Sequence, residues 1–377
     1  MLKVALVGCG KVADSHAAEL LRIHGCEIAG VCDREPLMAK QLAERFSVKA
    51  CFSDLADLLA TCRPDVVHIT TPPASHFGLA KLCLESGCHV YVEKPFALNA
   101  EDARVLIDLA VQRGLKITAG HDDQFSHVAL RMRKLIQDGF LGGPPVHMES
   151  YYCYPLGKSA YANAVIADKT HWVRALPGKL LHNIISHGIA RMAEFLATDS
   201  LRVLVHAFRS PILVQMGETE IIDELRVIVA EPGGPTACFT FSSQMRPPLH
   251  QFRIYGPKNG LLLDQDQETL IRLRGEQRKS YLEKFVSPLT LAKQYRQNVI
   301  SNIGLFLARD FHMKSGMKNL IERFYRSISE DGAPPIPYRE ILLTASIMDA
   351  IFERMEQAAK ESHGSECVQA ETCAINV

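Results

Sequence analysis

The sequence lacks the features that mark membrane-spanning and nucleic-acid-binding proteins. None of its apolar runs approaches the ~20 residues that a membrane-spanning helix needs. Its 42 basic and 42 acidic side chains give a formal net charge of zero. Without an excess of positive charge, electrostatic binding to nucleic acid or to an anionic membrane is not expected. We therefore expect no nucleic acid and no membrane as a partner, and a small molecule as the ligand.

Cysteine is not scarce, but it shows no pattern. The eleven cysteines are an odd number, are scattered, and include no Cys-x-x-Cys pair. Neither a disulfide framework nor a metal site is expected from such spacing. Reduced thiols are typical of the cytoplasm, so we expect a cytoplasmic protein without a bound metal. Internal repeats are also absent, and a chain of 377 residues without repeats predicts two or three domains.

The first third of the chain alternates short apolar runs with segments of helical spacing. Such alternation is typical of βαβ units, which build a parallel sheet with helices on its faces. The strands are predicted at 2–7, 27–32, 65–70, 88–92 and 115–119, and the helices at 13–22, 36–46, 54–60, 77–85 and 99–112. We predict an α/β Rossmann domain over residues 1–122.

The turn after the first predicted strand carries a glycine fingerprint, Gly8-Cys9-Gly10-Lys11-Val12-Ala13. In this G-x-G-x-x-A pattern, Gly8 permits the tight turn and Gly10 lets the backbone approach a pyrophosphate. The free N–H groups at the start of the next helix then face the anion. A tight turn without a ligand is the alternative, but strand, turn and helix occur here in the required order. We therefore expect Gly8, Gly10, Lys11 and Val12 to bind a dinucleotide.

An acidic residue, Asp33, follows the second predicted strand. At this place a carboxylate binds the ribose hydroxyls and repels a 2′-phosphate, which favours NAD over NADP. Arg34 beside it could accommodate a 2′-phosphate, so NADP stays the alternative cofactor. A solvated surface charge is the other interpretation of Arg34.

Beyond residue 125 the alternation of strands and helices stops. Strand-like runs then dominate, at 146–152, 203–208, 225–230, 237–242, 252–255 and 261–263, and helical segments follow at 289–309, 317–327 and 340–355. This order predicts a second, α+β domain over residues 123–360, whose last helix packs back toward the first domain. From residue 361 onward we expect a disordered tail.

Three further stretches carry a family resemblance. They are residues 65–76 (DVVHITTPPASH), 91–95 (YVEKP) and 254–260 (IYGPKNG). Together with the glycine fingerprint, they resemble the glucose–fructose oxidoreductase and inositol dehydrogenase (Gfo/Idh/MocA) family, from residue 2 to about residue 355. The Glu-Lys-Pro tripeptide after a Rossmann strand is the most specific mark. The resemblance implies a second domain with a large, open, mostly antiparallel sheet, whose outer face often forms the interface of a homodimer or homotetramer.

Lys94, in the Glu-Lys-Pro tripeptide, is catalytic in the family. Its position supports this role, because open α/β sheets bind ligands at the carboxyl ends of their strands. A cation there could steady the developing charge on a substrate oxygen. Without the resemblance, a lysine bonded to a helix end or to Glu93 would be an equal alternative.

The proton acceptor of the family is part of an Asp-x-x-x-His pattern. His187 matches the histidine, but Asn183 stands where the family has aspartate. If this stretch is helical, residues four apart share a face, so both can address one substrate. His187 can exchange a proton near neutral pH, whereas Asn183 can only hydrogen-bond. His182 is a rival, and a structural histidine is the alternative for both.

The resemblance implies further contacts to the cofactor, and the residue types before His182 suggest others to the substrate. Toward the cofactor it implies Thr70, Thr71, Pro72, His76, Glu93, Lys94 and Asp122. His76 could instead cap a helix, and the family often has asparagine where Asp122 stands. Tyr161, Trp172 and Arg174 lie in the irregular stretch before His182, and an aromatic face beside a guanidinium suits a sugar. A packed loop aromatic is the alternative for Trp172.

We therefore expect an NAD(P)-dependent oxidoreductase that moves hydride to or from a secondary alcohol carbon of a sugar, sugar derivative or cyclitol. Lys94, His187 and Asn183 are the expected catalytic residues. A redox-neutral enzyme that oxidises its sugar only transiently, for elimination, glycosidic cleavage or epimerisation, is one alternative. A non-catalytic NAD-binding regulator is another, and Asn183 is the feature that favours it.

Overall fold

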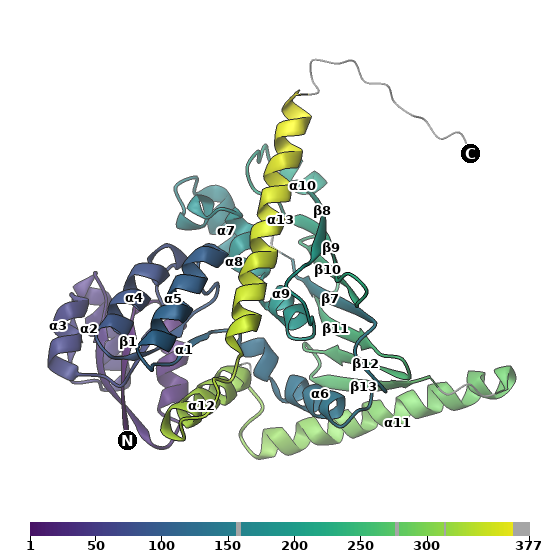
Figure 1. Ribbon diagram of the computed structural model, residues 1–377, viewed down its shortest axis with the longest axis horizontal. Helices are drawn as coiled ribbons and strands as arrows, with labels where there is room; N and C mark the ends of the chain where they lie inside the picture. The colour runs from purple at the N-terminus through teal and green to yellow at the C-terminus, as the bar shows by residue number, and fades with distance from the viewer. Residues whose placement is uncertain (156–159, 276–278, 313, 365–377) are drawn as a thin grey trace.

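The computed structural model describes residues 1–155, 160–275, 279–312 and 314–364. It contains two sheets, on opposite sides of the molecule, with helices between them (Figure 1). In this part of the chain, no helix is both long enough and apolar enough to cross a bilayer. The predicted tail from residue 361 falls largely on residues 365–377, which lie outside the described residues.

The first sheet has six parallel strands in the order β3-β2-β1-β4-β5-β6. They are β1 (Leu2–Val7), β2 (Cys26–Cys32), β3 (Cys51–Phe52), β4 (Val66–Ile69), β5 (His89–Val92) and β6 (Ile117–Ala119). This is the strand order of the Rossmann fold, so the predicted α/β domain is confirmed. The apolar runs are continuous because helices cover both faces of the sheet. The two-residue β3 was not predicted.

Five helices connect these strands. They are α1 (Lys11–Leu20), α2 (Pro36–Phe46), α3 (Leu55–Cys62), α4 (His76–Glu85) and α5 (Ala100–Gln112). Their starts follow from local chemistry: Asn99 caps α5 by accepting a hydrogen bond from the Asp102 backbone N–H at 2.7 Å. Pro36 begins α2, where its missing N–H costs nothing.

The second sheet has seven strands in the order β13-β12-β11-β7-β10-β9-β8. They are β7 (His147–Cys153), β8 (Arg202–Phe208), β9 (Glu224–Ala230), β10 (Thr236–Ser242), β11 (Leu249–Tyr255), β12 (Asn259–Asp264) and β13 (Thr269–Arg274). Only the β7–β10 pair is parallel among these strands, so the expected open, mostly antiparallel sheet is confirmed. Sequence analysis missed β13.

Helices cover one face of the second sheet, and the other face is open in Figure 1. The covering helices are α6 (His127–Gln137), α9 (Ser186–Ala193) and α13 (Tyr338–Gly364). Sequence analysis missed α6. On the open face, Leu204, Phe208 and Ile228 are exposed. The sheet therefore presents apolar side chains to solvent on the side that no described helix covers.

The long helix α11 (Ser280–Leu307) runs along the edge of the second sheet and projects beyond it (Figure 1). Two amides, one helical turn apart, bond the free backbone edge of β13. The Gln294 side chain accepts from the Arg272 N–H at 2.8 Å and donates to its carbonyl at 3.2 Å. Asn298 bonds the N–H and carbonyl of Leu270 at 3.1 and 3.0 Å. These contacts satisfy an edge strand that would otherwise be free to pair with another chain.

Two hydrophobic cores lie behind the two sheets. The first gathers apolar residues of the Rossmann domain, and α12 (Ser315–Ser329) returns to it with Met317, Leu320 and Phe324. We had expected this helix within the second domain. The second core lies between the second sheet and its covering helices, and it includes Ile347 and Phe352 of α13. The chain therefore crosses between the domains again at α12, next to the loops that end the Rossmann strands.

Candidate active site

The glycine fingerprint has the geometry that a dinucleotide requires. Gly8 has a φ of +92°, and a Cβ there would lie 2.6 Å from the Thr71 side chain, so only glycine fits. Gly10 precedes α1, whose first N–H groups have no side-chain cap, and a Cβ on Gly10 would meet no atom within 4 Å. Lys11 and Val12 are exposed at the start of the helix. The space above this helix N-terminus is thus open to a pyrophosphate, and these residues fit the cofactor.

Asp33 is tied to the fingerprint. Its carboxylate accepts the backbone N–H of Cys9 at 2.7 Å and that of Glu35 at 2.9 Å. These bonds fix an acid at the end of β2, next to the glycine turn, where a ribose diol would lie. Arg34 is exposed beside it. The positions of both residues agree with their predicted places.

The loops after β4 and β5 are linked by buried side chains. The Thr70 hydroxyl donates to the Gly8 carbonyl at 2.6 Å, so it fastens β4 to the glycine turn. His76 is fully buried, and its two ring nitrogens lie 2.9 Å from the Pro95 carbonyl and 2.8 Å from the Thr71 carbonyl. Its predicted contact with the cofactor is therefore replaced by a clamp between two backbone loops, one of which carries Thr71 and Pro72.

A buried chain of polar groups holds Glu93. His16 on α1 lies 2.8 Å from the Glu93 carboxylate, its other ring nitrogen lies 2.8 Å from His68 on β4, and His68 lies 2.8 Å from the Tyr325 hydroxyl on α12. We call these four residues the buried relay. Burial disfavours ionisation of Glu93, but the bond to His16 and the charges of His16 and Lys94 outweigh it and lower its pKa to about 2.

One set of tautomers satisfies every member of the buried relay. An ionised Glu93 accepts the Nε2–H of His16, whose Nδ1 then accepts the Nδ1–H of His68. The Nε2 of His68 in turn accepts the Tyr325 hydroxyl proton. The second carboxylate oxygen of Glu93 accepts the backbone N–H of Lys94 at 3.1 Å. Sequence analysis missed this relay, although a histidine inside the apolar strand 66–69 was a signal for it.

Lys94 reaches across to the second domain. Its ammonium donates to the backbone carbonyl of Asn183 at 3.1 Å. The stretch around Asn183 is helical but is interrupted: α8 (Lys179–Ile184) ends at Ile184 and α9 begins at Ser186. Carbonyls in the last turn of a helix lack partners within the helix and attract cations. The interruption of the helix thus supplies the acceptor that holds Lys94.

His187, in the first turn of α9, faces two carboxylates of the Rossmann domain. Asp122 and Asp123 lie in the 3₁₀ turn η2 (Asp122–Phe125), directly after β6. The His187 Nδ1 is 3.9 Å from Asp122 and 3.7 Å from Asp123. These distances are too long for hydrogen bonds, and the buried Nδ1 has no hydrogen-bond partner. We call His187, Asp122 and Asp123 the open cluster.

The open cluster has donor types that could hold a metal ion, since its ligand atoms lie within 4.8 Å of one another. The guanidinium of Arg191, however, lies 3.5 Å from Asp123 and supplies positive charge at that carboxylate. Burial disfavours ionisation of Asp123, but His187 and Arg191 outweigh it and lower its pKa to about 2. We therefore interpret the open cluster as proton-transfer groups rather than as metal ligands.

A cavity of about 630 Å³ opens in front of the cluster, between the two domains. Its lining comes from η2, α6, the second sheet and the chain that leads into α12. The residues are Asp122, Asp123, Ser126, His127, Tyr152, His187, His250, Gln265, Asp266, Glu268, Phe311, His312, Lys314, Ser315 and Gly316. Tyr152 stacks on His187 with ring centroids 5.8 Å apart. Sequence analysis missed Asp123, Tyr152 and His250.

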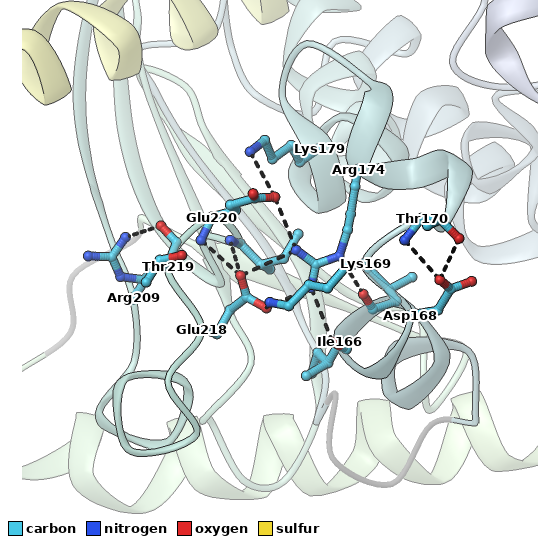
Figure 2. Close-up of polar contacts among 12 residues, drawn as sticks. Ile166, Asp168, Lys169, Thr170, Arg174, Lys179, Arg209, Glu218, Thr219 and Glu220 are labelled. Carbon is cyan, nitrogen blue, oxygen red and sulfur yellow. Dashed lines mark hydrogen bonds and ion pairs between the residues drawn. The ribbon is translucent and has the colours of Figure 1, made fainter.

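Arg174, a predicted substrate ligand, forms its hydrogen bonds with other groups of the protein (Figure 2). It donates to Glu218 through both terminal nitrogens, to Glu220, and to the carbonyls of Val165 and Ile166. These five contacts match the five N–H groups of a guanidinium, so none is left for a substrate. Arg174 therefore fastens the loop 165–174 to the segment 218–220, and its predicted role is corrected.

The other predicted substrate residues have different positions. Trp172 is 37% exposed, stacks on His171, and is not among the described residues that line the cavity. Its role in substrate binding stays a prediction. The side chain of Tyr161 lies outside the described residues. His182 is buried and stacks on Phe352 with centroids 4.9 Å apart, as a structural histidine would.

Residues 2–121 match a family described as "Oxidoreductase family, NAD-binding Rossmann fold". Two curated relatives are a D-glucoside 3-dehydrogenase from Escherichia coli (strain K12) and a UDP-N-acetylglucosamine 3-dehydrogenase from Acidithiobacillus ferrooxidans. The first is 33% identical over 37% of this chain and 40% of its own length. The second is 31% identical over 44% of this chain and 50% of its own length. The matched stretches thus span half or less of these relatives.

Solved structures match over nearly the whole chain. The WlbA dehydrogenase from Bordetella pertussis, in complex with NADH and UDP-GlcNAcA, is 17% identical, covers 95% of this chain and 96% of its own, and has a TM-score of 0.73. At this identity the likeness shows the fold, including that of the second domain. Residues 2–121 are thus similar to the NAD-binding Rossmann domain of the Gfo/Idh/MocA oxidoreductase family, and the likeness of the rest of the chain is one of fold.

Proposed function

We propose that this protein is an NAD-dependent dehydrogenase of a secondary alcohol carbon in a sugar, sugar derivative or cyclitol. The observation that carries the proposal is that Lys94, after β5 of the Rossmann sheet, donates to the carbonyl of Asn183, four residues before His187, and that His187 lines a cavity between the domains. The two curated relatives described above are named as dehydrogenases of a glucoside and of a nucleotide sugar. NAD supplies the hydride acceptor when it is bound.

The chain's own residues supply positioning and proton transfer. The Lys94 ammonium, which donates to the Asn183 carbonyl at 3.1 Å, is the donor to the reacting oxygen, and the Lys94 backbone N–H donates to the Glu93 carboxylate. His187 is the base for the hydroxyl proton, because burial lowers its pKa to about 4 and keeps the imidazole neutral. The Asn183 side chain orients a substrate hydroxyl.

The lining of the cavity favours an uncharged polyol over an anionic sugar. Four carboxylates line it, Asp122, Asp123, Asp266 and Glu268, against one lysine, Lys314, and no arginine among the residues described. Carboxylates accept hydrogen bonds from sugar hydroxyls and repel a uronate or a pyrophosphate. We therefore propose a neutral glycoside, free sugar or cyclitol as the substrate, and NAD rather than NADP because the Asp33 carboxylate, held beside the glycine turn, would repel a 2′-phosphate.

The absorbance of reduced nicotinamide tests this proposal. Purified protein would be mixed with NAD and a panel of neutral glycosides, inositols, uronates and nucleotide sugars. We expect turnover with a neutral polyol, none with the anionic sugars, and a loss of turnover of at least about 10³-fold in Lys94→Ala with little change in NADH affinity. Equal loss of NADH binding and turnover in Lys94→Ala would contradict the assigned role.

Silence across the panel, with tight NADH binding, would instead favour the redox-neutral or regulatory alternatives. Turnover of a glycoside without added NAD, by protein that retains the cofactor through purification, would identify the redox-neutral enzyme. Binding of NADH with no substrate-dependent change at all would identify the regulator. The three functions are therefore separated by one set of measurements.

We also propose a cytoplasmic homo-oligomer, a dimer or tetramer, that buries the open face of the second sheet. Leu204, Phe208 and Ile228 are 64%, 38% and 44% exposed there. Large apolar side chains exposed on one face of a sheet are typical of an interface. Light scattering would test it: Leu204→Glu is expected to dissociate the oligomer into monomers, whereas the exposed and charged Arg202→Glu on the same strand is expected to weaken it less.

A further inference from the structure

The acids nearest His187 come from the Rossmann domain and not from the helix that carries the histidine. Asp122 and Asp123 end β6, whereas His187 begins α9. The imidazole Nδ1 lies within 4 Å of both carboxylates, is buried, and forms no hydrogen bond. A buried nitrogen left unsatisfied beside two acids costs stability, so its retention calls for a function.

At two positions the chain carries the opposite member of the acid and amide pair from the one that the family resemblance implies. Residue 183, where that pattern has aspartate, is asparagine, and residue 122, where it often has asparagine, is aspartate. An amide can neither take up nor release a proton at these pH values. The only one of these two positions that can exchange a proton is therefore 122.

We propose that Asp122 exchanges the reaction's proton with His187 and so replaces an acid at position 183. This inference rests on the proposed dehydrogenase function and names a further residue for it. During oxidation the substrate O–H bond breaks and its proton passes to the His187 imidazole, while the C–H bond breaks and its electron pair leaves as hydride to oxidised nicotinamide. The imidazolium then gives a proton from Nδ1, through one bridging water across the 3.9 Å gap, to ionised Asp122.

The direction of this transfer follows from the surroundings of both groups. Burial lowers the pKa of His187 to about 4. Burial and the neighbouring Asp123 raise the pKa of Asp122 to about 7. The proton therefore moves downhill from the imidazolium to the carboxylate, which restores the neutral base. Asp122 lines the cavity and its side chain is 15% exposed, so it can pass the proton to water.

The charges around Asp122 explain why this member of the acid pair holds the proton. The charged or titratable groups that face it are Asp123 on η2, Lys314 before α12, Glu93 and Lys94 after β5, and His187 on α9. Asp123 has the closer cation, Arg191, and accepts a hydrogen bond from Gln265 at 2.7 Å. Two like charges this close cannot ionise equally, so the pair divides into an ionised Asp123 and a titrating Asp122.

The test compares single and exchanged variants in the cofactor-loaded enzyme. Asp122→Asn is expected to lower kcat by about 10²-fold and to remove the limb of the pH–rate profile near neutrality. The double variant Asp122→Asn/Asn183→Asp, which restores the family arrangement, is expected to recover at least about tenfold of that loss. Asp138→Asn, the same chemical change at an exposed carboxylate on the far end of α6, is expected to leave kcat unchanged.

A second readout needs no turnover. The His187 ring, followed by NMR during a pH titration of the protein, is expected to report a protonation near pH 7 on its neighbour, and Asp122→Asn is expected to abolish that event. If Asp122→Asn turned over as fast as the wild-type protein and kept the same limb of the pH–rate profile, the role assigned to Asp122 would be overturned, but the proposed function would not. Absence of turnover in the wild-type protein would overturn the proposed function, and the role of Asp122 with it.

Discussion

The buried relay and the open cluster use similar residues in opposite ways. In the buried relay, Glu93, His16, His68 and Tyr325 are joined by contacts of 2.8 Å, and no member needs a partner from outside. In the open cluster, the closest approach of His187 to its acids is 3.7 Å, and its buried Nδ1 is unpaired. One is complete in the protein alone, whereas the other is complete only when a further group or a proton arrives.

This difference indicates which of the two groups of residues stabilises the fold and which one takes part in the reaction. A satisfied polar network stabilises one arrangement, and its removal is paid in stability. A polar network with unsatisfied groups is destabilising until a substrate or a proton binds to those groups, and such networks are common in active sites. The contrast predicts that changes in the relay alter folding, and that changes in the open cluster alter turnover and its pH dependence.

The largest expected effect is that of His187→Asn on turnover. Because an amide cannot accept the hydroxyl proton, kcat should fall by about 10³- to 10⁴-fold, which corresponds to about 4–5 kcal/mol of activation free energy. The free energy of unfolding should change by less than about 1 kcal/mol, since no hydrogen bond to Nδ1 is lost. Steady-state kinetics and urea unfolding measure both. A large loss of stability with turnover intact would reverse the comparison.

A buried ion pair far from the cavity sharpens the comparison. Arg174 and Glu218 have side chains that are 4% and 1% exposed, and Arg174→Met leaves the buried acid without its main partner. We expect the free energy of unfolding to fall by about 3–5 kcal/mol, with KM unchanged. The matched change Lys169→Met removes a partner of the same acid that is 59% exposed, and should cost about 1 kcal/mol or less. A raised KM in Arg174→Met would restore its predicted role in substrate binding.

These contrasts also show which parts of the site a sequence can predict. The Rossmann strands and the glycine turn were predictable because periodicity and a required φ at Gly8 are local properties. Lys94 and His187 were reached through local motifs. Arg174 was misassigned because its partner Glu218 lies 44 residues away, and no local pattern joins them.

The site residues that the sequence did not predict come from elements that are far apart in the chain. Asp123 follows a Rossmann strand, Tyr152 comes from β7 and His250 from β11, and only the folded chain brings them to one cavity. The break at Ile185, which frees the Asn183 carbonyl for Lys94, has no proline or glycine beside it to announce it. His68 was the exception, because a histidine in a fully buried strand needs a partner, although the sequence could not name Tyr325.

His68 offers the next test, within the buried relay itself. His68→Leu leaves both the His16 Nδ1 and the Tyr325 hydroxyl unpaired in the core, so we expect a loss of about 2–3 kcal/mol in the free energy of unfolding. His68→Asn, whose amide nitrogen can stand in for Nδ1, should recover about half of it. Turnover per folded molecule should be nearly unchanged in both. A selective loss of kcat in His68→Leu that His68→Asn restores would mean that the relay also positions Lys94 for catalysis.

The smallest expected effect is a pH-dependent gain in stability from Asp122→Asn. The folded-state pKa of Asp122, about 7, lies above its ordinary value of 3.8, so between these values the folded protein holds a proton that the unfolded chain has lost. Wild-type stability should therefore fall as pH rises through this window, and asparagine should not show the fall. At pH near 4 the two proteins should be equally stable, and above pH 7 the variant should be the more stable of the two. Guanidinium unfolding across this pH range measures the difference. In the control Asp138→Asn, the difference in the free energy of unfolding from the wild-type protein should be the same at every pH. A gain that does not vary with pH would mean that Asp122 is already ionised and held by its neighbours, and the open cluster would then be as satisfied as the buried relay.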